Sequence, residues 1–170
     1  MCGIVGYIGK KPVYDILING LKKLEYRGYD SSGVMIYNNE LLVKKSKGKV
    51  SALENLFSNE KDKKGTIGIG HTRWATHGPP NQVNSHPHIS NSGEISLVHN
   101  GIIENYDSIK KILLKKGYTF SSDTDSEVLV NLIEDIKKSK KVKLGKAVYY
   151  ALKQVVGAYA IVAFDSTNPK

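Results

Sequence analysis

The chain begins with MCGIVGYIGK (residues 1–10), which contains its single cysteine, Cys2. Residues 3–8 combine β-branched side chains with small glycines, a composition typical of a buried strand. Removal of Met1 would leave Cys2 with both its thiol and a free α-amine. An α-amine titrates at about pH 7.7–8.0 and a thiol at about 8.5, so the amine can take the thiol proton near neutral pH. The stretch therefore predicts an N-terminal nucleophile with its own base, against the alternative that a terminal cysteine is incidental.

Composition places the chain among ordinary globular proteins. Of its 170 residues, 40% are hydrophobic and 24% are charged, and we expect one domain over residues 1–170. One cysteine excludes an internal disulfide framework and favours a reducing, cytoplasmic location. No apolar run is long enough to cross a bilayer, and the N-terminus lacks the basic start of a signal peptide, so we expect no membrane partner.

The net charge of +9 raises a second class of function, a basic domain that binds nucleic acid. The lysines concentrate in residues 61–64, 110–116 and 137–146, which read as a loop and exposed helix faces. These runs lack interleaved aromatic residues and any known nucleic-acid motif. We therefore predict a solvated surface and no nucleic-acid partner.

Strands and helices are mixed along the chain. Apolar residues at spacings of three and four predict helices near residues 12–24, 50–57, 105–116, 128–136 and 144–155. Strand-like runs occupy residues 3–8, 34–37, 41–45, 67–71, 95–99 and 158–164. The long stretch 72–93 contains three prolines and little periodicity, and a loop of that length is often functional. The order of elements predicts an α+β fold in which helices cover the sheets.

The loop GHTRWATHG (residues 70–78) is dense in polar residues and follows an expected strand. Arg73 offers a planar fork suited to a carboxylate, and Trp74 is the only tryptophan. An isolated arginine usually forms a surface pair, and an isolated tryptophan usually packs in a core. Because Thr72, Thr76 and His77 flank this pair, we predict a polar pocket.

Two further motifs each have two interpretations. Asn100-Gly101 between apolar runs is a strong signal for a type I′ hairpin turn, but a side-chain amide and a backbone N–H can equally form an oxyanion hole. Asp123 and Asp125 precede a helix and suit capping, although one of them could bind an ammonium group. The five histidines lack the spacing of a metal site, so we expect no metal and assign most of them to structural hydrogen bonding.

Taken together, the motifs closely resemble one family. The segments involved are CGIVG (2–6), LEYRGYDSSG (24–33), HTRWATHG (71–78), NSHPH (84–88), VHNGIIEN (98–105) and TDSE (124–127). They look like the glutaminase domain of the glutamine–fructose-6-phosphate aminotransferases, which are class II glutamine amidotransferases. The likeness runs from Cys2 to the last expected strand. EYRGYDS and HTRWATHG are typical of this branch among the class II enzymes.

The resemblance implies an α+β N-terminal nucleophile hydrolase fold with four layers in the order αββα. It implies that Cys2 attacks L-glutamine and that Asn100 and Gly101 hold the oxyanion. The residues matching Arg73, Thr76 and His77 would bind the α-carboxylate, and the one matching Asp125 the α-ammonium. The residue matching Trp74 would close over glutamine, and the one matching Arg27 would lie near the thiol. No cofactor is implied.

Length is where the chain departs from the family. Members of the family carry two sugar isomerase domains after the glutaminase domain, so we expect those domains to be partners of this one. The full-length enzymes usually form homo-oligomers. We also expect the glutaminase domain itself to be C-terminally truncated, which would leave a sheet edge unpaired. The leading hypothesis is the ammonia-supplying half of glucosamine-6-phosphate synthesis. The alternative is an inactive fragment that serves as a binding or assembly module.

Overall fold

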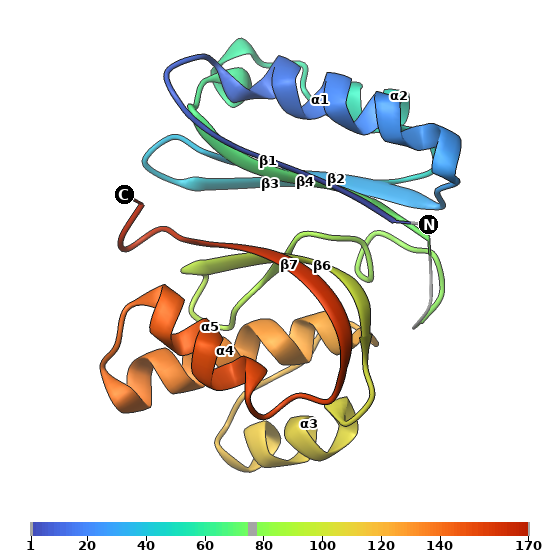
Figure 1. Cartoon of the computed structure of the whole chain (residues 1–170). Helices are drawn as coiled ribbons and strands as arrows, with labels where there is room; N and C mark the ends of the chain where they lie inside the picture. Colours follow the sequence, from blue (N-terminus) through green and yellow to red (C-terminus); the bar gives the residue numbers. More distant parts are fainter. Residues whose placement is uncertain (1, 75–77, 170) are drawn as a thin grey trace. The chain divides into compact units, whose positions relative to one another are not determined.

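The computed structural model describes residues 2–74 and 78–169, and Figure 1 traces the chain. The chain divides into two compact units, which are Met1–Pro87 (unit 1) and His88–Lys170 (unit 2). Each unit has its own β-sheet and its own hydrophobic core. Within the described residues, every helix is too short or too polar to cross a lipid bilayer.

The sheet of unit 1 has four strands in the order β1-β4-β2-β3, and all neighbours are antiparallel. The strands are β1 (Gly3–Ile8), β2 (Ser31–Tyr37), β3 (Leu41–Lys47) and β4 (Ile67–Arg73). Residues 31–33 belong to β2, although their composition predicts a loop, because they pair with β4 on one side and β3 on the other. This pairing sets Ser31 opposite Arg73.

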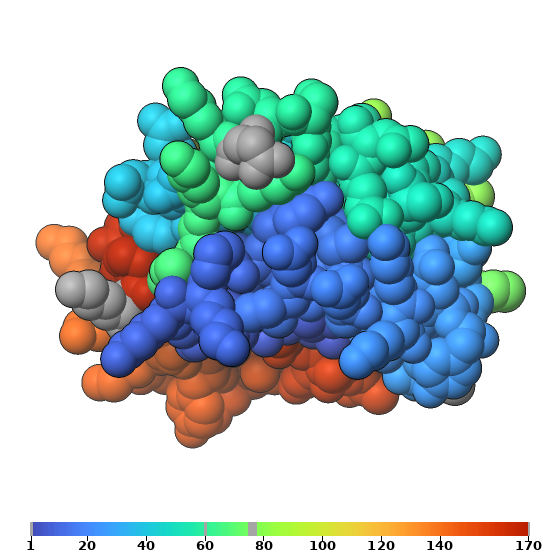
Figure 2. Space-filling view, turned by 90° about the horizontal axis from the view of Figure 1, so that it is seen from above, coloured from blue at the N-terminus to red at the C-terminus, as the bar shows by residue number. Residues whose placement is uncertain are grey.

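Two helices cover one face of this sheet, as Figure 1 shows. Helix α1 (Val13–Leu24) follows Pro12 and buries Leu17 and Leu21 completely, while α2 (Val50–Glu54) is shorter than the sequence predicts. A salt bridge of 2.8 Å between Lys22 and Glu54 joins the two helices. Figure 2 shows the blue surface of α1 beside the teal surface of the α2 region on this face. Two 3-10 turns, η1 (Glu25–Arg27) and η2 (Glu60–Lys63), complete the unit's helical segments within the described residues.

The sheet of unit 2 has three antiparallel strands in the order β5-β6-β7. They are β5 (His88–Ile89), β6 (Ile95–Ile103) and β7 (Gly157–Asp165). Composition did not predict β5, and β6 continues four residues beyond the expected end at His99 because β7 pairs along its whole length. Its helices are α3 (Tyr106–Lys115), α4 (Asp125–Lys140) and α5 (Leu144–Leu152). They bury a core against β6 that includes Ile95, Leu97 and Ile103.

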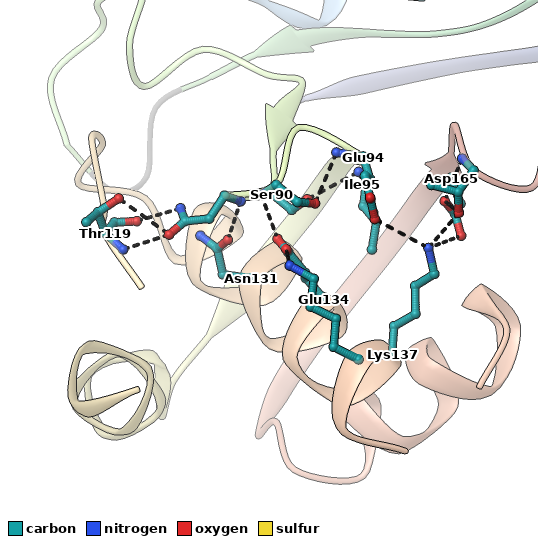
Figure 3. A network of polar contacts seen from close by, with 12 residues as sticks. Ser90, Glu94, Ile95, Thr119, Asn131, Glu134, Lys137 and Asp165 are labelled. Atoms are coloured by element: carbon teal, nitrogen blue, oxygen red, sulfur yellow. Dashed lines mark hydrogen bonds and ion pairs between the residues drawn. The ribbon is translucent and has the colours of Figure 1, made fainter. Parts of the chain in front are cut away.

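Polar side chains of α4 tie this helix to the strands, as Figure 3 shows. Lys137 Nζ lies 2.7 Å from Asp165 Oδ2 at the end of β7. Glu134 accepts a hydrogen bond from the backbone of Ser92 and pairs with Lys138. Burial alone would raise the pKa of Glu134, but the hydrogen bonds from Lys138 and Ser92 outweigh it and hold the pKa below its ordinary value. The helix that carries Asp125 is therefore fixed by charge as well as by apolar packing.

The N-cap of α4 is Thr124, whose side chain accepts a hydrogen bond from the backbone N–H of Glu127. In a capping box, the glutamate would reach back to the N-cap backbone. Here its carboxylate reaches further and accepts bonds from the backbone N–H groups of Ser121 and Ser122, at 3.0 and 2.7 Å. The approach to the helix is thus ordered for several residues before Asp125.

Candidate active site

Cys2 lies directly before β1, and its thiol contacts the chain just beyond β4. The backbone N–H of Trp74 donates to Cys2 Sγ at 3.1 Å, and the thiol lies 3.4 Å from the Trp74 carbonyl oxygen. This contact follows from the sheet register, which sets Gly3 opposite Thr72. The antiparallel pairing of β1 with β4 therefore brings the only thiol to the segment that carries Arg73.

Arg73 is the last residue of β4, and only 4% of it is exposed. Its guanidinium donates to the backbone carbonyls of Gly78 and Pro79 at 3.3 and 3.4 Å, and it lies 3.9 Å from Asp30 Oδ1. These distances are at or beyond the long end of the range for hydrogen bonds. A carboxylate ligand could therefore offer the fork shorter, charge-assisted bonds than these contacts do.

Trp74 is 54% exposed and does not pack in the core. Its six-membered ring lies against Gly28, where a Cβ would be 2.4 Å from Trp74 Cζ3. Gly28 also has a φ of +87°, which favours glycine. Arg27 ends η1 immediately before this glycine. The two other residues expected in this loop, Thr76 and His77, lie outside the described residues.

Asn100 and Gly101 lie inside β6, opposite Ala160 and Tyr159 of β7. The hairpin interpretation of this pair is therefore wrong, because the chain continues as a strand to Ile103. Gly101 has a φ of +134°, and a Cβ there would lie 2.0 Å from the carbonyl oxygen of Ala158. The glycine is thus required by the close approach of β7 and not by a turn.

Asp125 is the first residue of α4 and is 4% exposed, whereas Asp123 is on the surface. Oδ2 of Asp125 accepts a hydrogen bond from the backbone N–H of Ile103, at 2.8 Å. The N-terminus of a helix favours a negative charge. A buried carboxylate in this position can bind a cation, which makes Asp125 the better of the two candidates for an ammonium group.

One candidate side chain in each unit, Arg73 in unit 1 and Asn100 in unit 2, points to the sheet face that the unit's own helices do not cover. A Cβ at Gly3 would touch Leu24 of α1, so the row containing Gly3 and Thr72 faces that helix. Arg73 is one residue further along β4 and points to the opposite face. In unit 2, His99 contacts Ser126 of α4, so its neighbour Asn100 points away from the helices.

The four histidines that the structure describes take part in local contacts. His71 stacks on His86 with ring centroids 4.2 Å apart, and His88 Nε2 lies 3.0 Å from Thr124 Oγ1. His99 Nδ1 lies 2.8 Å from Ser126 Oγ. Among the residues of the chain that the structure describes, no group of three or more histidine, cysteine or acidic side chains could hold a metal ion.

Comparison with known proteins identifies the family. Residues 56–170 match the family described as "Glutamine amidotransferase domain". The chain belongs to this family. It is a class II glutamine amidotransferase domain, and its α+β fold is of the N-terminal nucleophile hydrolase type.

Several enzymes named glutamine–fructose-6-phosphate aminotransferase (isomerizing) are similar to this amidotransferase domain along its whole length. The enzyme from Bacteroides thetaiotaomicron is 59% identical over 172 residues, which cover 100% of this chain and 28% of that protein. The enzyme from Clostridium perfringens is 51% identical over 171 residues, covering 100% of this chain and 27% of the relative. The domain therefore spans little more than a quarter of the length of these relatives.

Among solved structures, the domain resembles the glutamine phosphoribosylpyrophosphate amidotransferase of B. subtilis. The TM-score is 0.80 at 29% identity, and the match covers 98% of this chain and 35% of that one. A glutamine aminotransferase class-II domain protein from Silicibacter pomeroyi matches with a TM-score of 0.54 at 16% identity, over 80% of this chain and 68% of that one. At that identity, the second likeness concerns the fold alone.

Sequence reasoning missed three polar residues that touch the candidate site. Asp30 lies beside Arg73, and Ser126 and His99 lie beside Asp125. Asp30 lies in the RGYDSSG segment, directly before β2. Only the pairing of β2 with β4 shows that it lies beside Arg73. Ser126 lies two residues after Thr124, the N-cap of α4. The sequence around it gave no sign that its side chain would also contact Asp125.

Proposed function

We propose that this amidotransferase domain hydrolyses L-glutamine to glutamate and ammonia, with Cys2 as the nucleophile. The observation that carries the proposal is the contact between the Cys2 thiol and the backbone of Trp74, one residue beyond the buried Arg73. A nucleophile thus lies beside a cation that can hold the carboxylate end of an amino acid. Membership of the family supports glutamine as that amino acid.

The proposed reaction has two halves. After removal of Met1, the α-amine of Cys2 takes the thiol proton, and the sulfur attacks the side-chain carbonyl carbon of glutamine. The negative charge that develops on the carbonyl oxygen is held by the Asn100 side-chain amide and the Gly101 backbone N–H. The intermediate collapses to a γ-glutamyl thioester, and the departing nitrogen takes the proton and leaves as ammonia. Water then attacks the thioester and releases glutamate, which regenerates the thiol.

Recognition in this proposal relies on opposite charges. Glutamine is a zwitterion, so a cation and an anion at a fixed separation select it. Arg73 would bind the α-carboxylate with Thr76 and His77, and Asp125 would bind the α-ammonium. Trp74, exposed and resting on Gly28, would cover the bound substrate, and Arg27 would support the thiol. A site built on such contacts rejects analogues that lack either charged group.

The wider role is proposed from the relatives' names. The ammonia would serve the formation of glucosamine 6-phosphate from fructose 6-phosphate, with sugar isomerase domains as partners in a homo-oligomeric, cytoplasmic enzyme. The four-layer αββα arrangement over residues 1–170 belongs to the same proposal. Its support is that each unit leaves one sheet face uncovered by its own helices, to which Arg73 points in unit 1 and Asn100 in unit 2.

A glutaminase assay combined with intact mass tests this function. Protein that has lost Met1 should release glutamate and ammonia in equal amounts from L-glutamine and none from D-glutamine. Protein that retains Met1 is the matched control and should be silent. If the processed protein is also silent, the hydrolase proposal is overturned and the alternative, a binding or assembly module, is favoured.

A further inference from the structure

The carboxylate of Asp125 is held by both of its oxygens. Oδ2 accepts from the backbone N–H of Ile103 at 2.8 Å, and Oδ1 accepts from the hydroxyl of Ser126 at 3.4 Å. The same hydroxyl lies 2.8 Å from Nδ1 of His99. His99, Asp125 and Ser126 are 3%, 4% and 2% exposed. The contacts thus form one buried chain between strand β6 and the first turn of helix α4.

The direction of the hydrogen bonds in this chain follows from counting protons. An ionised carboxylate can only accept, so in the 3.4 Å contact with Asp125 the hydroxyl of Ser126 is the donor. A hydroxyl has one proton, so when Ser126 donates to Asp125 it is Nδ1 of His99 that donates to Ser126 Oγ. His99 carries a proton on Nδ1 in this arrangement. The two donors to Asp125 leave the remaining lone pairs of its carboxylate for a ligand.

We infer that Ser126 is a positioning residue, oriented by His99, that aims the carboxylate of Asp125 at the α-ammonium group of glutamine. The inference rests on the proposed function and adds a specificity determinant to it. The contacts of Asp125 and Ser126 also involve strand β6, because His99 and Ile103 lie on either side of Asn100-Gly101 in that strand. One carboxylate therefore links recognition of the ammonium group to the strand that would hold the oxyanion.

The test compares two substrates that differ only in the α-ammonium group, L-glutamine and 4-carbamoylbutanoate. In Ser126→Ala, kcat/KM for glutamine should fall about threefold to tenfold, the range expected for one hydrogen bond, mainly through KM. For 4-carbamoylbutanoate, kcat/KM should stay within about twofold of wild type, because that substrate makes no contact for Asp125 to support. Ser126→Thr keeps the hydroxyl and should restore the preference for glutamine.

Ser122→Ala is the matched control. Its hydroxyl is also buried at the start of α4, but it donates to Glu127 and not to Asp125. This variant should lower Tm and leave the ratio of the two kcat/KM values unchanged. An equal loss on both substrates in Ser126→Ala would assign Ser126 a structural role only, and no loss on glutamine would leave it without any role. Either result overturns the inference while the proposed function stands, whereas a silent wild type overturns the function.

A second measurement is independent of turnover. In protein labelled with 15N-histidine, the ring of His99 should carry a proton on Nδ1, and Ser126→Ala should shift that resonance. A wild-type His99 with a bare Nδ1 would overturn the inference, since Ser126 would then have to donate to histidine and could not donate to Asp125.

Discussion

The two units hold their candidate residues in different ways. In unit 1, Cys2 precedes a strand and Arg73 ends one, and their contacts include backbone atoms at 3.1–3.4 Å and an ion pair at 3.9 Å. In unit 2, Asn100 lies inside a strand, and Asp125 begins a 16-residue helix and accepts a bond of 2.8 Å. The candidate nucleophile thus lies before the first strand of its sheet, and the candidate groups for charge stabilisation lie inside a strand and at the start of a helix.

This difference has a physical reason in the proposed reaction. A nucleophile must form and break a bond, and the position of Cys2 before β1 keeps its thiol outside both hydrophobic cores. Groups that stabilise developing charge are most effective when they need no reorganisation. We therefore expect changes in unit 1 to alter activity with little loss of stability, and changes in unit 2 to alter both.

The largest effect should come from Cys2. Cys2→Ala, or a tag that blocks the terminus, should abolish glutamate release because the nucleophile or its base is lost. Tm should stay within about 2 °C of wild type, since the thiol lies outside both hydrophobic cores. Turnover and thermal unfolding are measured on the same samples. Equal turnover by tagged and untagged protein would rule out the N-terminal nucleophile.

Asn100→Ala should reduce kcat by about 10²–10³, the usual loss for one oxyanion donor. Glutamine Kd should change far less, because Arg73 and Asp125 would still hold the other end of the substrate. Stopped-flow or steady-state kinetics give kcat. Because Cys2→Ala cannot turn glutamine over, calorimetric titration of glutamine into Cys2→Ala and into the double variant Cys2→Ala/Asn100→Ala gives the two Kd values. A lowered Tm with near-normal kcat would show that Asn100 serves the strand alone.

Arg73→Ala and Asp125→Ala should each lower kcat/KM for glutamine about tenfold or more, through loss of a charge-assisted contact. Asp125→Ala should also cost about 1–3 kcal/mol of unfolding free energy, because the buried N–H of Ile103 loses its acceptor. Asp125→Asn separates the two effects, since it keeps an acceptor oxygen and loses the charge. It should recover stability without recovering kcat/KM, and recovery of both would remove Asp125 from ammonium binding.

The smallest effect concerns acid stability, which should depend on unit 2. Burial would raise the pKa values of Glu134 and Asp165, but hydrogen bonds led by Lys138 and Lys137 lower both. A carboxyl group with a lowered folded-state pKa stabilises the protein above its unfolded value of about 4, and this contribution is lost as pH falls through the folded value. Glu134→Gln should therefore weaken stability at pH 7 and flatten its decline below about pH 4. Urea unfolding across that range measures the slope, and an unchanged slope would contradict this account.

Much of the fold could be predicted from local patterns. The strand at residues 3–8 and helix α1 follow from composition and periodicity, and both are confirmed. Asn100-Gly101 could not be assigned locally, because its turn-like sequence meets β7, a strand more than fifty residues away in the chain, and becomes the interior of β6. Long-range pairing also made a strand of residues 31–33, where composition indicates a loop.

The candidate site divides in the same way. Cys2, Arg73 and Asp125 could be named from the sequence because their chemistry is specific and their motifs resemble one family. Asp30, His99 and Ser126 could not, since only the fold places Asp30 beside Arg73 and the other two beside Asp125. The carried-over roles of the named residues remain predictions that the experiments above decide.

Covalent labelling tests the central claim most directly. Protein that has lost Met1 is incubated with a diazoketone analogue of glutamine, and the adduct is located by peptide mass spectrometry. The proposed mechanism predicts one adduct per chain, on Cys2, slowed by excess L-glutamine and absent in Cys2→Ala. An adduct on another residue, or none on a protein that still releases glutamate, would contradict the assignment of Cys2 as the nucleophile.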